Sequence, residues 1–301
     1  MSSLGHSLQP ELVALAFGNN KTYVDFARDA LDGFQVAYPQ ARCIVMDPSS
    51  LPSEIYAYAE SHRRGYGYFR WKPYLTLQIF DSLAEGSILM YVDGRDRVLP
   101  LQNHWLDRLI EDLQIDMVVY QLPGHTEHTW TRADLMSRFY FPIDGRHANT
   151  DQYTANFFAL RVNARTRHFL QHWNGFMQAN FDLCTDAPSR LPNHYSFREN
   201  RYDQSVFSLL VKTLAPHDIC LYVIHEPEPV QVHAKGHPPI ISGFFGSRYI
   251  GTLIYQIRIR AFYLYWLFLV GVSKVRLCSR SRSADHKNPS RRAGRATTSF
   301  L

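Results

Sequence analysis

The sequence contains few cysteines, and their spacing excludes two common uses of this residue. The four are Cys43, Cys184, Cys220 and Cys278, and they form no CxxC or CxxH pair within the 301 residues. Zinc-binding and redox motifs need such pairs, and disulfide-built domains need more cysteines in a shorter chain. The sequence therefore predicts unpaired thiols in a reducing compartment.

The chain also lacks a recognisable secretory signal and a long apolar run. Its first residues show no basic segment followed by an apolar stretch, which a signal peptide requires. The uncharged stretch 261–272 has 12 residues, whereas a membrane-spanning helix needs roughly 20. We therefore expect a cytoplasmic protein.

The C-terminal part differs in composition from the rest. Residues 247–278 combine bulky aromatic and aliphatic side chains with arginines, a pattern typical of an amphipathic helix in a membrane interface. Peripheral contact of 253–278 with the inner membrane face is one interpretation, and a helix in a core or an oligomer interface is the other. Residues 279–301 are rich in Ser, Arg and Ala, which predicts a disordered basic tail.

Positive charge is concentrated at the end of the chain. The formal net charge is +5, but ten Lys and Arg against one Asp lie from residue 253 onward. The first 252 residues hold 22 Lys and Arg against 26 Asp and Glu, a net charge of −4. Because proteins that bind nucleic acid specifically carry a basic surface on the fold itself, we expect no specific nucleic acid partner.

Apolar runs of strand length alternate with helical patterns in the first 125 residues. The four expected strands are residues 11–18, 41–47, 87–92 and 115–122. The three expected helices are residues 22–34, 73–83 and 103–112. Buried strands separated by helices form parallel sheets. The prediction is an α/β fold with a mostly parallel central sheet flanked by helices, beginning with a Rossmann-like half.

A second set of elements is expected after residue 125. These are helices at 129–139 and 164–178, a strand at 154–163, a helix after 202, a strand at 219–224 and a Pro-rich loop at 225–240. Asp203 is the expected N-cap of the later helix, because Asp accepts hydrogen bonds from unpaired N–H groups of a first turn.

Residues 65–98 form the most informative segment. Pro73 can open a helix, since the N–H that it lacks has no partner in a first turn, and Gly86 ends the apolar pattern that follows. A short buried strand then ends at Asp93, with Asp96 three positions later. Carboxylates at the carboxyl end of such a strand lie where open α/β sheets bind ligands, so this acidic turn is a candidate metal–phosphate site.

Two sequence segments resemble nucleotide-sugar-dependent glycosyltransferases of the GT-A type. They are WKPYLTLQIFDSLAEGSILMYVDG at 71–94 and RYDQSVFSLL at 201–210. The resemblance implies a GT-A catalytic domain at 1–246, with a nucleotide-binding half at 11–124 and an acceptor half at 125–246. It also implies transfer of a sugar from a nucleoside diphosphate donor to a glycan or glycoconjugate acceptor, as in the biosynthesis of a surface polysaccharide.

The resemblance also implies a divalent cation, Mn²⁺ or Mg²⁺, between carboxylates and the donor diphosphate. Asp93 is the leading ligand and Asp96 the second, although Asp93 also suits a turn and Asp96 also suits an ion pair with a neighbouring arginine. Strict DxD enzymes have a carboxylate where this chain has Arg95, which is able to hold phosphate directly. In the His-x-x-Gly segment, His233 is the candidate third ligand and Lys235 a candidate for the diphosphate.

Four residues lie at the ends of the first two strands. They are Phe17, Gly18, Asn19 and Asp47, and Phe17 is equally suited to the core. In similar enzymes these strand ends contact the base and ribose of the donor, so the resemblance implies the same role here.

Lys72 and Asp203 complete the candidate site. Lys72 is either a phosphate ligand or a surface cation, and Asp203 resembles the acidic residue that acts as base or orients the acceptor. Asp151 and Gln152 form a weaker candidate pair of the same kind. The alternative to an enzyme is a non-catalytic, membrane-associated scaffold with a decayed transferase fold, which the missing strict DxD and the incomplete His-Gly segment motivate.

Overall fold

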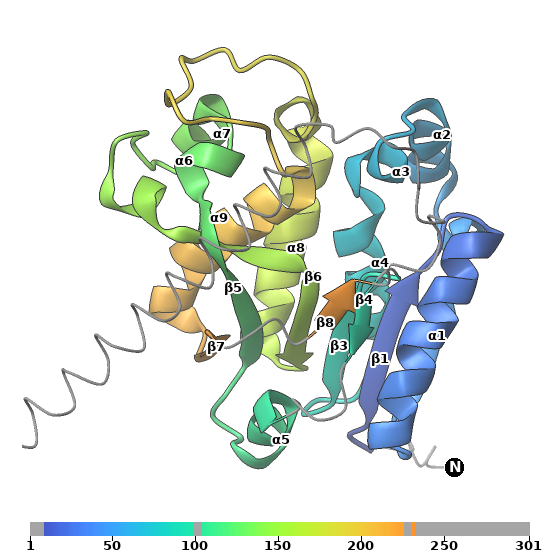
Figure 1. The fold of residues 1–301 in the computed structure, drawn as a ribbon. Helices are drawn as coiled ribbons and strands as arrows, with labels where there is room; N and C mark the ends of the chain where they lie inside the picture. The colour runs from blue at the N-terminus through green and yellow to red at the C-terminus, as the bar shows by residue number, and fades with distance from the viewer. Residues whose placement is uncertain (1–8, 95, 99–103, 226–229, 233–301) are drawn as a thin grey trace, which may run out of the picture. The chain divides into compact units, whose positions relative to one another are not determined.

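The structure is a computed structural model that describes residues 9–94, 96–98, 104–225 and 230–232 (Figure 1). The chain divides into two compact units, Met1–Ile240 and Ile241–Leu301. All described residues belong to the first unit. The predictions for 247–278 and 279–301 therefore lie outside the described residues.

A central sheet organises the first unit. Within the described residues it has six strands in the order β2-β1-β3-β6-β5-β7. Their bounds are β1 Leu12–Phe17, β2 Arg42–Met46, β3 Ile88–Val92, β5 Met117–Thr126, β6 Asp151–Arg161 and β7 Leu221–Ile224. β6 is antiparallel to both of its neighbours, β3 and β5, and the other adjacent pairs are parallel. The α/β fold with a mostly parallel sheet is confirmed.

Helices cover both faces of the sheet (Figure 1). The longer ones are α1 Lys21–Ala37, α2 Ser53–Ser61, α4 Trp71–Asp81, α5 His104–Glu111, α8 Ala164–Ala179 and α9 Tyr202–Asp218. Successive side chains of a strand point to opposite faces, so β1 serves two cores. Val13 and Leu15 pack with α4, α8 and α9, whereas Ala14 and Ala16 pack with α1 and α5.

Shorter elements connect these layers. They are α3 Gly65–Tyr68, α6 Glu127–Trp130, α7 Ala133–Arg138, β4 Asp96–Val98, β8 Val230–Val232 and the 3₁₀ turns Pro48–Ser50, Arg146–Asn149 and Phe181–Cys184. β4 and β8 pair antiparallel in a small second sheet.

Four details of the sequence prediction were wrong. The strand at 41–47 is half-buried because β2 lies at an edge of the sheet. The helix expected at 129–139 is broken into α6 and α7, with extended backbone at Thr131 and Arg132. The loop expected at 225–240 contains β8. Asp203 is not an N-cap, since α9 already begins at Tyr202.

Candidate functional site

The carboxyl ends of three parallel strands meet at one edge of the sheet. After β1 the backbone N–H of Gly18 donates to the carbonyl of Met46 in β2 at 3.0 Å. The turn after β3 lies against the same place: a Cβ at Gly94 would stand 3.0 Å from the carbonyl oxygen of Phe17 and 3.2 Å from that of Tyr23. This close approach of two backbones explains why glycine follows Asp93.

Lys72 joins two of the predicted acidic residues. Its Nζ lies 3.1 Å from Oδ1 of Asp93 and 2.8 Å from Oδ2 of Asp203. It also donates to the carbonyl oxygen of Ala155 in β6 at 3.2 Å. The side chain of Lys72 is 1% exposed, so the surface-cation interpretation is wrong. We call these three residues, Asp93, Lys72 and Asp203, the charge cluster.

The buried partners determine which groups of the charge cluster are ionised. Burial alone would lower the pKa of Lys72, but the carboxylates of Asp203 and Asp93 outweigh it and raise that pKa. Burial raises the pKa of Asp203 to about 6, although the ammonium of Lys72 opposes the rise. Around neutral pH Lys72 is therefore an ammonium and Asp203 is mainly a carboxylate.

Asp93 is the member of the cluster that faces solvent most. Its side chain is 21% exposed, against 5% for Asp203. The hydroxyl of Tyr91, two residues earlier on β3, donates to its Oδ1 at 2.7 Å. The other side of Oδ1 meets Lys72. Asp93 is thus fixed in orientation while part of its carboxylate stays accessible to a ligand.

A strained turn places Lys72. Five consecutive residues have a left-handed backbone: Gly65 (φ 56°), Tyr66 (49°), Gly67 (81°), Tyr68 (53°) and Phe69 (61°). This conformation costs roughly 1–2 kcal/mol for each residue that is not glycine, and such strain is concentrated at functional sites. The indole N–H of Trp71 donates to the carbonyl of Gly65 at 3.2 Å and closes the turn onto α4.

The ring of Trp71 also connects the turn to β1. It stacks on the ring of Phe17 with centroids 4.0 Å apart. Phe17 is 5% exposed, so the structure places this side chain in the core.

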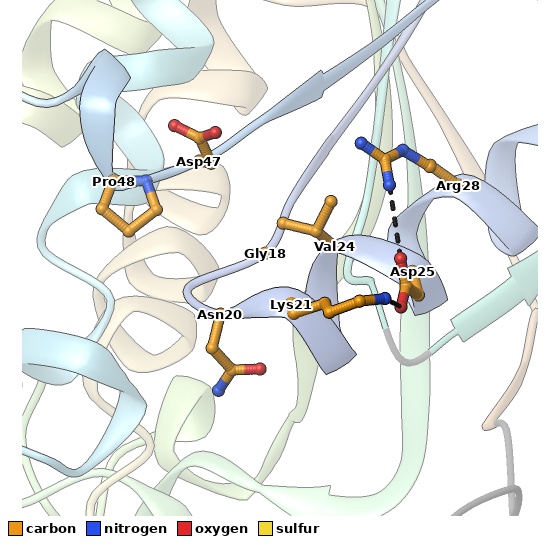
Figure 2. Close-up of a pocket in the computed structure, with 8 residues that line it drawn as sticks. All are labelled: Gly18, Asn20, Lys21, Val24, Asp25, Arg28, Asp47 and Pro48. Carbon is orange, nitrogen blue, oxygen red and sulfur yellow. Dashed lines mark hydrogen bonds and ion pairs between the residues drawn. The ribbon is translucent and has the colours of Figure 1, made fainter.

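A pocket of about 450 Å³ opens beside the ends of β1 and β2 (Figure 2). Its lining residues are Gly18, Asn20, Lys21, Val24, Asp25, Arg28, Asp47 and Pro48. The volume falls within the roughly 300–1,000 Å³ that is usual for small-molecule sites. The pocket includes Gly18 and Asp47 of the predicted nucleoside side but not Asn19.

Two of the pocket residues are held firmly. A Cβ at Gly18 would lie 2.3 Å from the backbone nitrogen of Val24, so only glycine fits. Asp47 accepts hydrogen bonds from the hydroxyl of Ser49 at 2.6 Å and from its N–H at 2.8 Å, which lower the pKa of Asp47. Asp47 is therefore an anionic acceptor at the rim of the pocket.

Several predicted site residues lie wholly or partly outside the described residues. Arg95, His233 and Lys235 are outside them, and only the main chain of Asp96 is described. In the small sheet Asp96 stands opposite Val232, which precedes His233 in the sequence. Among the described residues, no group of three or more His, Cys, Asp and Glu side chains is arranged to hold a metal ion.

Two further findings concern the helices and the cysteines of the described residues. No helix among them has the length and apolar character needed to cross a membrane. Three cysteines in the described ranges, Cys43, Cys184 and Cys220, are free thiols, as predicted.

Sequence reasoning missed the surroundings of the charge cluster. In the sequence Tyr91 looks like any other apolar residue of a buried strand. No sequence pattern indicates that the carbonyl of Ala155 contacts Lys72. Glu127 belongs to no sequence motif, yet it is fully buried and accepts a hydrogen bond from Gln152.

No protein-family model matches the sequence, and the comparison with curated proteins gave no match. Solved structures similar to the chain include a glycosyltransferase involved in glycosylation of the major capsid of PBCV-1 (12% identity, TM-score 0.38, covering 71% of this chain and 81% of that one). Mouse xyloside xylosyltransferase 1 has 12% identity and a TM-score of 0.39, covering 71% and 84%. The galactosyltransferase LgtC has 13% identity and a TM-score of 0.37, covering 69% and 72%. Similarity at this level does not establish a shared activity.

Proposed function

We propose that this protein is a glycosyltransferase that moves a sugar from a nucleoside diphosphate donor to a glycan or glycoconjugate acceptor. The observation that carries the proposal is the charge cluster. Lys72 is held between Asp93, at the carboxyl end of a parallel strand, and Asp203 on α9. Burying a charge is costly unless it is paired, and three charged groups gathered at the ligand-binding edge of a sheet are typical of a functional site.

The pocket beside β1 and β2 is the proposed site of the donor's nucleoside. Asp47, with its low pKa, is suited to accept hydrogen bonds from ribose hydroxyls. The turn at Gly94 lies against Phe17, which directly precedes Gly18 of the pocket. A diphosphate that leaves the pocket in this direction would reach Asp93.

A divalent cation, Mn²⁺ or Mg²⁺, belongs to the proposal. Mg²⁺ commonly binds one or two carboxylates together with substrate phosphates and water, and Asp93 offers a fixed, partly exposed carboxylate for this purpose. Asp96 and His233 are the proposed further ligands, and Arg95 and Lys235 the proposed diphosphate contacts. When bound, the cation would neutralise the charge of the leaving diphosphate.

Lys72 and Asp203 have a different proposed role. Because Asp93 is the more exposed of the two carboxylates, we assign the cation to Asp93 and propose that Asp203 holds Lys72 and orients the acceptor hydroxyl. A pKa of about 6 keeps its carboxylate ionised at neutral pH and available as a proton acceptor.

The alternative hypothesis, a non-catalytic scaffold, predicts that the site residues no longer keep a functional arrangement. The charge cluster is instead intact, with Lys72 in contact with both Asp93 and Asp203, so we favour the enzyme over the scaffold. Cytoplasmic location and membrane contact through 253–278 remain parts of the proposal that rest on the sequence alone.

A donor screen tests the function. UDP-, GDP-, ADP- and dTDP-sugars are mixed with the full chain in Mn²⁺, in Mg²⁺ and in EDTA, and binding and hydrolysis are measured. We expect binding and slow hydrolysis of at least one donor, faster with a cation. Protein that is folded by circular dichroism but neither binds nor hydrolyses any donor would contradict the proposal.

A further inference from the structure

A second buried charge pair joins α6 and α9. Glu127, at the start of α6, is fully buried, and its Oε1 accepts from Nζ of Lys212 on α9 at 2.6 Å and from the hydroxyl of Ser208. Its Oε2 accepts from the hydroxyl of Thr131 at 2.7 Å and from Nε2 of Gln152 at 3.1 Å. All four partners are donors, because a carboxylate can only accept.

These contacts leave one orientation for the amide of Gln152. Its Nε2 faces Oε2 of Glu127, the hydroxyl of Thr131 at 2.8 Å and the carbonyl of Trp130 at 3.3 Å. The Thr131 hydroxyl has already given its proton to Glu127, so it acts as an acceptor here. With acceptors on this side, the amide nitrogen must lie here and the oxygen on the opposite side.

The oriented amide of Gln152 in turn fixes the orientation of the Gln204 amide. Oε1 of Gln152 accepts from Nε2 of Gln204 at 2.7 Å, and Oε1 of Gln204 accepts from the hydroxyl of Thr154 at 3.4 Å. Gln204 is 5% exposed and follows Asp203 directly in the first turn of α9. A carboxylate outside the charge cluster thus sets which way the amide of Gln204 points.

We infer that Glu127 is a positioning residue: through Gln152 it fixes the amide of Gln204, whose partner Thr154 precedes Ala155, the residue whose carbonyl binds Lys72 of the charge cluster. The inference rests on the proposed function for its kinetic consequence, but the orientation of the amide stands on the contacts alone. A glutamine at position 127 can donate as well as accept, so it no longer specifies one orientation of Gln152.

Glu127→Gln alone would leave Lys212 buried without its carboxylate, and that variant is expected to lose stability for this reason. The informative variant is therefore the double substitution Glu127→Gln with Lys212→Met, which removes both charges of the pair. Glu85→Gln, at an exposed site on the loop before β3, is the matched control.

The first readout is the side-chain amide signal of Gln204 in a ¹⁵N-correlated NMR spectrum, assigned with Gln204→Ala. In the double variant we expect this signal to shift or split, because two orientations become populated, while Glu85→Gln leaves it unchanged. An unchanged signal in a folded double variant would overturn the inference whether or not the protein is a glycosyltransferase.

The second readout is kinetic, with the donor that the screen identifies. We expect kcat of the double variant to fall by at least about 10-fold while KM for the donor changes little, since misorientation of a group in the site mainly affects the transition state. Equal kcat for the double variant and the wild type would also overturn the inference. Wild-type protein without any transfer would refute the proposed function and leave the NMR result to decide the positioning role.

Discussion

Nζ of Lys72 lies 2.8 Å from Oδ2 of Asp203, so residues from α4 and α9 form one buried ion pair. The pair is shielded from water, since the two side chains are 1% and 5% exposed. In such a place each charge depends on the other, and the partly exposed Asp93 shares the same ammonium.

Removing the ammonium should destabilise the protein strongly. Lys72→Met leaves two carboxylates facing each other without a cation, and breaking a buried pair costs about 3–5 kcal/mol. Lys21→Met is the control: Lys21 pairs with Asp25 on the surface, and such pairs contribute at most about 1 kcal/mol. Urea unfolding of both variants measures the difference, and equal losses would show that the buried pair does not stabilise the fold.

The rate of transfer should depend on the ionisation of Asp203. With a pKa of about 6, this carboxyl is ionised at neutral pH and becomes protonated below pH 6. We expect kcat/KM to fall below about pH 6, approaching a tenfold drop per pH unit in more acid solution. Because the ammonium of Lys72 favours the ionised form of Asp203, Lys72→Gln should raise the pKa of Asp203. The fall of kcat/KM should then begin at higher pH. A flat profile between pH 5 and 8 would rule out a role for Asp203 as proton acceptor.

Two glycines should respond oppositely to alanine. At Gly94 a Cβ meets the carbonyl oxygen of Phe17 at 3.0 Å, and at Gly175 on α8 it meets nothing within 4 Å. Gly94→Ala should lower the free energy of unfolding by about 1–3 kcal/mol, as overpacking does. Gly175→Ala should raise it by about 0.5–1 kcal/mol, the helix preference of alanine. The midpoints of denaturation compare the two directly.

Asp47 should affect donor binding without affecting the chemical step. In Asp47→Ala the pocket loses an anionic acceptor, so KM for the donor should rise about tenfold while kcat stays within about twofold, the signature of lost uniform binding. Asp32→Ala, at an exposed position on α1, should change neither constant. If Asp47→Ala leaves KM unchanged, the nucleoside binds elsewhere.

The sheet was largely predictable because its signals are local. The apolar runs at β1 and β3 and the helical spacing of α4 each follow from neighbouring residues. The insertion of antiparallel β6 between β3 and β5 was not predictable, since pairing between distant strands leaves no pattern within either strand.

The site was predictable in its members but not in their contacts. Asp93, Lys72 and Asp203 were each found from a motif, yet the meeting of Lys72 with both carboxylates depends on how α4 and α9 pack. The N-cap prediction failed for a local reason: the carbonyl of Arg201 already accepts from the N–H of Gln204, so α9 begins at Tyr202, one residue before Asp203.

The turnover of Asp93→Asn beside that of Asp32→Asn, with the donor that the screen identifies, decides whether Asp93 belongs to the transfer site. Asparagine keeps the size of Asp93 but removes the charge that faces the ligand, whereas Asp32 lies on the exposed side of α1. We predict that Asp93→Asn loses transfer by at least about 100-fold while circular dichroism stays that of the wild type, and that Asp32→Asn keeps full activity. Wild-type turnover by folded Asp93→Asn would show that the transfer site lies elsewhere.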